Sequence, residues 1–420
     1  MAFGVFGLST FSNVVTMLFS FIFGTNYVLL FNSLVHSDIG RYSTAIRFVS
    51  AIGGTLVLIV LIVISYLERV TIHYKAFGTF VLLFNFFLTL LCMIVTFCVD
   101  FSGDFKKEYF YIIIECLNCM LPPCNFVIFF NFSYSCSAQH TTAYIVGVSF
   151  GKVVACSLAL AQIDAQYSFF IVLLITLLAV IIWILLLTVY NRYYSLLESQ
   201  ENINFPGSLS DSETALIMKE SPSKTFIEII KRIRYSLLTI FLCYFVSFML
   251  FPRFLSTTYR WFACEEFGSA YEYHQLQIVG KRILVCSLVS SVGDFLGRCL
   301  QFFPKIPPVK FVFTTCVIYS AITLVVVLLV YFSTAWDIDI AEVSQLMMSI
   351  LGFFLSGING YLVACAIEHS LINIEPRLAV AVVSLSLYVG VVFGNLFGST
   401  VSLIDNIISS NTDCSMPLFA

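Results

Sequence analysis

Long apolar runs, separated by short polar segments, cover most of this 420-residue chain. A helix needs about 20 mainly apolar residues to cross the hydrocarbon layer of a bilayer. The pattern predicts eleven membrane-spanning helices, at residues 11–34, 44–67, 76–99, 109–132, 141–163, 167–190, 236–255, 279–303, 308–332, 341–368 and 376–403. The composition agrees, since 60% of the residues are hydrophobic and 11% are charged, whereas soluble domains carry about 25% charged residues. We therefore expect an all-α polytopic membrane protein.

One polar segment interrupts this pattern and divides the predicted helices into six and five. Residues 191–235 carry charged side chains among Ser, Asn and Pro, a composition typical of a poorly ordered tether. We therefore expect three parts: an N-terminal six-helix bundle at 1–190, a cytoplasmic polar linker loop at 191–235 and a C-terminal five-helix bundle at 236–420.

The distribution of Lys and Arg predicts the orientation in the membrane. With a cytoplasmic N-terminus, eleven Lys and Arg residues fall in cytoplasmic segments and eight fall in outside segments. Cytoplasmic loops of membrane proteins carry the excess of positive charge. An odd number of spans then places the C-terminus outside.

A charged residue in the middle of a membrane span costs about 3 kcal/mol or more, and three such residues stand out here. Asp294 and Arg298 lie in the predicted span at 279–303, and their spacing of four places them on one face of a helix. We expect this face to point to the protein interior or to a watery cavity. Lys152 interrupts the predicted span at 141–163. We expect its long side chain to extend to the cytoplasmic surface rather than to take part in ion coupling.

Glycines spaced by four residues predict close helix packing. Gly390, Gly394 and Gly398 form a GxxxGxxxG ridge in the last span, and Gly147 and Gly151 form a GxxxG pair in the fifth. Small residues at this spacing let helix backbones approach each other. In a chain with this many spans we expect the contacts to be intramolecular, and we expect a monomer.

Four motifs, in order along the chain, resemble those of the equilibrative nucleoside transporter family. Residues 293–298, Gly-Asp-Phe-Leu-Gly-Arg, resemble its Asp-x-x-Gly-Arg signature, and Phe251-Pro252 lies where that family commonly has Phe-Pro. Residues 357–362, Gly-Ile-Asn-Gly-Tyr-Leu, resemble its Asn-Gly-Tyr-Leu element, and residues 390–394 resemble its glycine-spaced last helix. The six-plus-five layout with a central loop also fits this family.

The first half departs from the family pattern at two places. Many members carry Trp-Asn in the first span, and the counterpart here is Phe31-Asn32. Many members place a substrate-binding Gln in the fourth span, where this chain has Phe126 with Asn125 beside it. Either Asn125 supplies the amide from a shifted helix, or that contact is absent.

The resemblance implies a major-facilitator-like fold without a twelfth span, in which two helix bundles rock about a central site. It implies transport of nucleosides or nucleobases, with purines preferred, at the plasma membrane. We expect this transport to be facilitative. A proton-coupled symporter of the same solutes and a carrier of a different small polar solute are the alternatives.

The resemblance also implies the substrate contacts. Asp294 would accept hydrogen bonds from the base or the ribose, and Arg298 would donate to the sugar or hold Asp294. The alternative for this pair is a self-compensating contact that only locks helices together. We expect further substrate contacts from Phe31, Asn32, Asn125, Ser291 and Val391, and structural roles in helix packing for Asn359, Gly360, Gly390 and Gly394.

An integral-membrane enzyme is the competing functional class. It would need His, Glu or Cys residues clustered at catalytic spacing near one membrane face. The five His residues are dispersed, without an HxxxH or HExxH pattern, and the fourteen Cys residues are scattered. We therefore expect no enzymatic activity, cofactor, metal or nucleic-acid partner, and we expect the substrate and the bilayer to be the partners.

Overall fold

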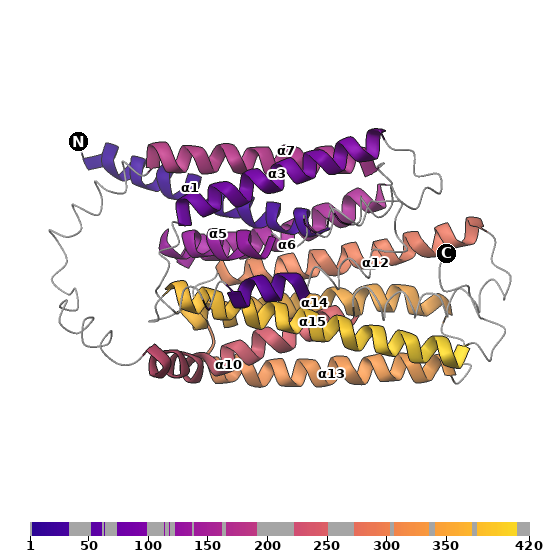
Figure 1. Ribbon diagram of the computed structural model, residues 1–420. Coiled ribbons are helices and arrows are strands. Elements are labelled where there is room, and N and C mark those ends of the chain that lie inside the picture. Colours follow the sequence, from indigo (N-terminus) through magenta and orange to yellow (C-terminus); the bar gives the residue numbers. More distant parts are fainter. Residues whose placement is uncertain are drawn as a thin grey trace.

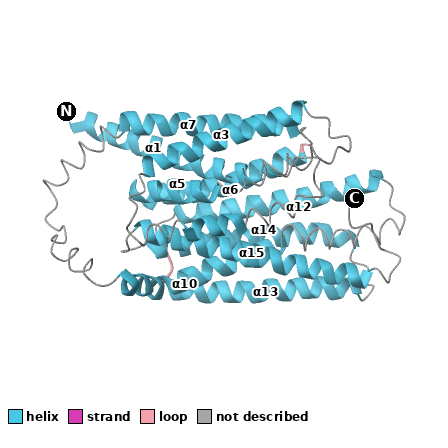
Figure 2. Ribbon diagram, viewed as in Figure 1, coloured by secondary structure: helices cyan, strands magenta, loops and turns pink. Residues whose placement is uncertain are grey.

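The computed structural model is almost entirely helical in the part of the chain that it describes (Figures 1 and 2). It describes residues 2–32, 52–60, 63, 74–98, 113, 117, 122–136, 138–161, 165–190, 222–250, 273–302, 306–335, 341–371 and 376–409. The helices run side by side along the long axis of the molecule. Helix α1 begins at one end of this bundle and α15 ends at the other (Figure 1).

The first half of the chain supplies one group of helices. After α1 (Ala2–Asn32), residues 52–60 are helical, and the chain continues with the helices α3 (Tyr74–Cys98), α5 (Pro122–Cys136), α6 (Ala138–Leu160) and α7 (Ala165–Leu185), the last extended by a π-helical turn at Leu186–Tyr190.

The second half supplies the remaining described helices. These are α10 (Pro222–Met249), α12 (Tyr273–Cys299) with a 3₁₀ turn at Leu300–Phe302, α13 (Val309–Ala335), α14 (Ala341–Leu371) and α15 (Pro376–Ser409).

The lengths and compositions of these helices are those of an integral membrane protein. Among the described residues, six helical segments are long and apolar enough to cross a bilayer: Ala76–Val95, Gln139–Leu160, Tyr167–Thr188, Gly280–Phe302, Val309–Val327 and Met348–Ser370. Val14–Leu30 and Val382–Gly398 are shorter apolar helical stretches. Large hydrophobic side chains such as Phe80, Phe170 and Phe311 are exposed, as expected where the surrounding solvent is lipid rather than water.

Several helix boundaries differ from the predicted ones. Helix α5 begins at Pro122-Pro123, because proline fits the first turn of a helix, where its missing N–H costs nothing. Residues 109–121 of the predicted fourth span lie outside the described residues, apart from 113 and 117. Helix α10 begins at Pro222, so residues 222–235 are not linker. Its first turns are amphipathic and bury Ile229 and Ile233 against Val382 of α15. The rest of the predicted linker, 191–221, lies outside the described residues.

The two halves repeat one contact pattern. Helix α1 packs along α5 and α6, and α10 packs in the same way along α14 and α15. When residues 52–60 are counted as the second helix of the first half, α1, α5 and α6 are its first, fourth and fifth helices. In the second half, α10, α14 and α15 hold the same positions. The halves meet where α6 contacts α12 and α14 and where α5 contacts α15.

Glycines let the longest helix pairs touch backbone to backbone. A Cβ atom at Gly147 of α6 would collide with the backbone oxygen of Phe21 on α1. At Gly390 of α15 it would lie 2.7 Å from the backbone oxygen of Phe241 on α10, and Gly394 makes an equivalent approach one turn later. The prediction that these glycines pack within the chain is confirmed.

Candidate functional site

Helix α12 carries Asp294 and Arg298 one turn apart, on a face that is turned into the protein. Nε of Arg298 donates a hydrogen bond to Oδ1 of Asp294 at 3.1 Å. Asp294 is 4% exposed and Arg298 is 1% exposed, whereas Leu296 on the other side of the helix is exposed. The prediction that this pair shares a face pointing to the interior is confirmed.

Lys152 of α6 completes a charged triad with Asp294 and Arg298. Its ammonium Nζ lies 3.0 Å from Oδ2 of Asp294, and its side chain is 30% exposed. The expectation that Lys152 extends to the cytoplasmic surface is therefore wrong. A carboxylate within hydrogen-bond distance holds the ammonium inside the bundle, since charge-assisted hydrogen bonds are the strong ones. Because α6 and α12 belong to different halves, this ion pair joins the two halves.

Helix α14 lies directly against the triad. A Cβ atom at Gly360 would lie 2.8 Å from Oδ1 of Asp294 and closer still to its backbone oxygen. One turn later on α12, a Cβ atom at Gly297 would collide with the backbone oxygen of Gly357. Gly360 is therefore packed closely against Asp294, and a side chain at this position would displace the carboxylate.

Asn359 holds α14 against α10. Its Nδ2 donates to Oγ of Ser247 at 2.9 Å, and the residue is buried. Its Oδ1 is buried without a hydrogen-bond partner among the described residues. The side chain thus contributes to a helix contact, as predicted.

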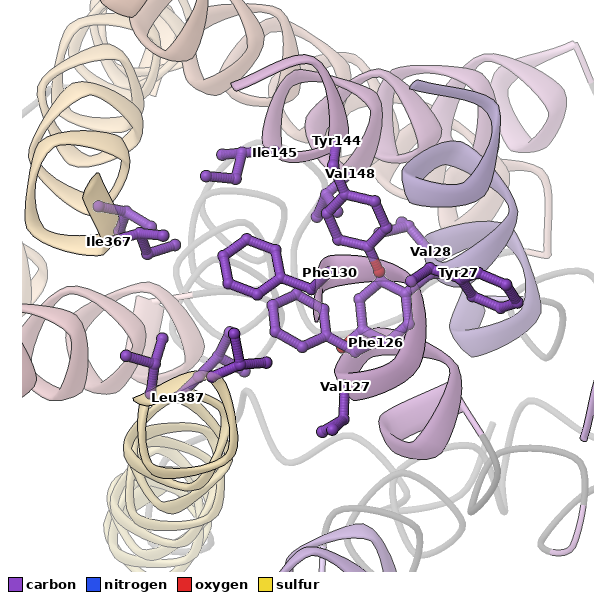
Figure 3. Packing of buried hydrophobic residues seen from close by; sticks show 14 of the residues in the cluster. Tyr27, Val28, Phe126, Val127, Phe130, Tyr144, Ile145, Val148, Ile367 and Leu387 are labelled. Carbon is purple, nitrogen blue, oxygen red and sulfur yellow. The ribbon is translucent and has the colours of Figure 1, made fainter. Parts of the chain in front are cut away.

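A central aromatic cluster, formed by Tyr27, Phe126, Phe130 and Tyr144, lies in the first half (Figure 3). The ring of Phe126 is 5.2 Å from the rings of both Tyr27 and Phe130 and 5.6 Å from the ring of Tyr144. All four side chains are buried. Three helices, α1, α5 and α6, therefore present flat apolar surface at one place.

The second half covers this cluster. The hydroxyl groups of Tyr27 and Tyr388 lie 2.6 Å apart, so α1 and α15 are joined by a hydrogen bond. Ile367 of α14 and Leu387 of α15 face the cluster from the same side (Figure 3). Val391, one turn after Leu387, is buried in the same core, where it can form an apolar wall.

Several buried polar atoms at this interface have no hydrogen-bond partner among the described residues. They are both amide atoms of Asn125, the hydroxyl of Tyr144 and Nη2 of Arg298. A buried polar atom left unsatisfied costs about 1–3 kcal/mol, and native proteins keep few of them. These atoms are therefore available to a polar ligand, and two of the residues, Asn125 and Arg298, were expected from the sequence to contact substrate.

Ser291 lies on the face of Asp294, as predicted, but it bonds within the protein. Its Oγ donates to the backbone oxygen of Ser287 at 2.8 Å and lies 3.5 Å from Sγ of Cys156 on α6. It therefore contributes to the contact between α6 and α12.

Two predicted elements lie outside what the structure describes. Phe31 and Asn32 end α1, but their side chains are outside the described set. The Phe251-Pro252 motif also lies outside the described residues.

Sequence reasoning missed the tyrosines that surround the triad. Tyr27 and Tyr388 bridge the halves, and Tyr244 of α10 lies beside the guanidinium of Arg298. The chain holds 21 Tyr residues, so one tyrosine in an apolar run carries no signal by itself. The signal that could have found the third charge was the position of Lys152 in the middle of a predicted span.

Within the described ranges, no three His, Cys, Asp or Glu side chains lie close enough together to hold a metal ion. Comparison of the chain with protein-family models and with curated proteins found no match.

Proposed function

We propose that this protein is a facilitative transporter of nucleosides and nucleobases, with purines preferred. In this proposal the chain crosses the membrane eleven times, as six plus five helices, and its two halves form major-facilitator-like bundles. The repeated packing of the first helix of each half on the fourth and fifth supports two related bundles. The four motifs that resemble equilibrative nucleoside transporters support the choice of substrate.

The observation that carries the proposal is the charged triad buried where the two halves meet. A charged residue in a membrane span is a functional-site hypothesis by default. Here three of them converge from α6 and α12, with Asp294 and Arg298 almost fully buried. If these residues only held helices together, well-packed apolar side chains would do so with an equal or more favourable free energy, because buried ion pairs contribute little to stability.

The surroundings of the triad suit a nucleoside. A nucleobase is flat and apolar on its faces, and the central aromatic cluster offers faces of the same kind. Its edges carry donors and acceptors, which Asn125, Tyr144 and Arg298 can match with atoms that have no partner among the described residues. The sugar hydroxyls can bond to the carboxylate of Asp294.

Alternating access requires contacts that break and form between the halves. The ion pair between Lys152 and Asp294 and the hydrogen bond between Tyr27 and Tyr388 are two such contacts. A substrate that binds Asp294 competes with Lys152 and so weakens the contact between α6 and α12. A ligand shifts a conformational equilibrium only through such a difference in affinity for the two states.

The surroundings of Asp294 favour facilitative over proton-coupled transport. Two cationic partners, at 3.0 and 3.1 Å, stabilise its negative charge. We do not expect this carboxylate to bind and release a proton in each cycle. We also propose a monomer in the plasma membrane, with a cytoplasmic N-terminus and an outside C-terminus.

Uptake by proteoliposomes tests the proposed function. Purified protein is reconstituted, and the uptake of labelled adenosine, inosine, hypoxanthine and glucose is compared with that of protein-free liposomes. We expect protein-dependent uptake of at least one purine compound, none of glucose, and no accumulation above equilibrium under an inward proton gradient. Uptake of glucose alone would favour a different solute carrier, and proton-driven accumulation would favour a symporter.

A further inference from the structure

The charged triad contains more positive than negative charge. Lys152 and Arg298 share the single carboxylate of Asp294, one on each oxygen. The other two acidic side chains that the structure describes are Glu228, which is exposed on α10, and Glu368, which accepts a hydrogen bond from Gln301. The described part of the site therefore has a net charge of +1.

The same site has more hydrogen-bond donors than acceptors. An ammonium carries three N–H donors and a guanidinium five. Lys152 uses one donor on Asp294 and keeps its side chain 30% exposed, while the buried Nη2 of Arg298 has no partner among the described residues. A ligand that fits here must bring acceptor atoms.

Aromatic side chains lie at the contact between α6 and α12 and beside Arg298. The rings of Phe150 and Phe295 lie 5.8 Å apart, and they belong to residues two positions before Lys152 and one position after Asp294. Tyr244 of α10 lies beside the guanidinium of Arg298. A flat ring with acceptors on its edge matches these surroundings.

Purine bases differ in the edge that they would present to this site. A 6-oxopurine has two adjacent acceptors, O6 and N7, which Lys or Arg bind well. A 6-aminopurine has N7 but places an amino donor where the oxygen would be. Two cations beside that amino group repel it, and each oxygen of Asp294, the acceptor at this place, is already bonded to one of them.

We propose that Lys152, together with Arg298, selects 6-oxopurines such as hypoxanthine, guanine and their nucleosides over 6-aminopurines. This inference rests on the proposed transport of purines. It adds which edge of the base is recognised, the one with O6 and N7, and that Lys152 recognises it. Lys152 binds Asp294 when the site is empty and turns one N–H toward the base oxygen when substrate enters. A well-placed pair of hydrogen bonds to O6 and N7 discriminates by about tenfold or more.

Competition for inosine uptake in proteoliposomes tests this inference. For the wild type, we expect hypoxanthine and inosine to inhibit at concentrations at least tenfold lower than adenine and adenosine. Lys152→Met keeps the length of the side chain but removes its charge. In this variant the inhibitory concentration of the 6-aminopurines should be only about 1–3 times that of the 6-oxopurines, because the contact with the base edge that distinguishes them is lost. The matched control is Lys281→Met, since Lys281 is exposed on α12, the helix that carries Asp294 and Arg298.

The outcomes separate the inference from the function on which it rests. Equal inhibition by both classes in the wild type, or an unchanged ratio in Lys152→Met, would overturn the selection of 6-oxopurines alone. Uptake of none of the four purines would overturn the proposed function and the inference with it. If Lys152→Met does not reach the membrane, the wild-type ratio still decides, and Lys152→Arg, which keeps the donors, should retain the preference.

Discussion

Lys152 and Asp294, 142 residues apart in the chain, form an ion pair across the interface between the two halves, with 3.0 Å between Nζ and Oδ2. The pair lies within two candidate membrane spans, Gln139–Leu160 of α6 and Gly280–Phe302, which begins in α12. Any relative movement of the halves that separates α6 from α12 must break this contact. The triad therefore couples the charge at the candidate site to the arrangement of the two halves.

Asp294→Asn should lower purine uptake at least tenfold while leaving the amount of protein in the membrane largely unchanged. Asparagine keeps the shape and one acceptor of aspartate but loses the charge that Lys152 and Arg298 both bind. Loss of a charge-assisted hydrogen bond to substrate is worth about 1.5–3 kcal/mol. Uptake kinetics normalised to surface protein provide the measurement. Wild-type kinetics for every purine would show that Asp294 does not bind substrate.

Arg298→Ala and Lys152→Ala should each be tolerated in folding, because Asp294 keeps one cation in either variant. The double variant leaves a buried carboxylate without a partner, which costs about 3–5 kcal/mol. Its melting temperature in detergent should therefore fall by more than the sum of the single decreases. Adding Asp294→Asn to the double variant removes the buried charge and should recover part of this loss. Additive decreases would mean that the two cations act independently.

Gly297→Ala should destabilise the protein, and Gly357→Ala on the facing helix should not. A Cβ atom at Gly297 collides with the backbone oxygen of Gly357, whereas a Cβ atom at Gly357 meets nothing closer than 3.5 Å. Alanine is otherwise favoured over glycine in a helix by about 1 kcal/mol, so Gly357→Ala should leave the stability unchanged or raise it. Thermal unfolding of the two purified variants compares them directly. Equal melting temperatures would argue against close packing of α12 on α14.

Ser291→Cys should allow an oxidative crosslink between α6 and α12. Its Oγ lies 3.5 Å from Sγ of Cys156, so a thiol there would be within reach of the native cysteine. A disulfide at this place fixes the two halves together, and we expect transport to stop and to return on reduction. The control is Ser291→Cys in a Cys156→Ser background, which should not respond to oxidation. Full transport by the crosslinked protein would mean that α6 and α12 do not separate.

The sequence predicted helices well where one apolar run was long and had clear ends. The span expected at 76–99 is α3, Tyr74–Cys98, and the span expected at 308–332 is α13, Val309–Ala335. It failed at α10, because an apolar-run criterion does not detect a helix whose first turns bury only one face. Ile229 and Ile233 supply that face, and their partner Val382 is distant in sequence.

The candidate site was predictable only where its signal is local. Asp294 and Arg298 are four residues apart, so a helical period places them together without knowledge of the fold. Lys152 is 142 residues away from Asp294, and its own long side chain allowed a second reading, in which it reaches the surface. Tyr27 and Tyr388 are 361 residues apart, so no local sequence pattern predicts their contact.

Counterflow of labelled inosine tests the central claim most directly. Proteoliposomes are loaded with unlabelled inosine at high concentration and diluted into a trace of labelled inosine. If the two halves alternate about one site, labelled inosine should accumulate inside transiently above its equilibrium level and then decay. The reason is that unlabelled inosine inside occupies the inward-facing site and so prevents the labelled inosine that has entered from leaving. The overshoot should be absent in Asp294→Asn. Simple equilibration of label without an overshoot, in preparations that do take up inosine, would contradict transport by alternating access.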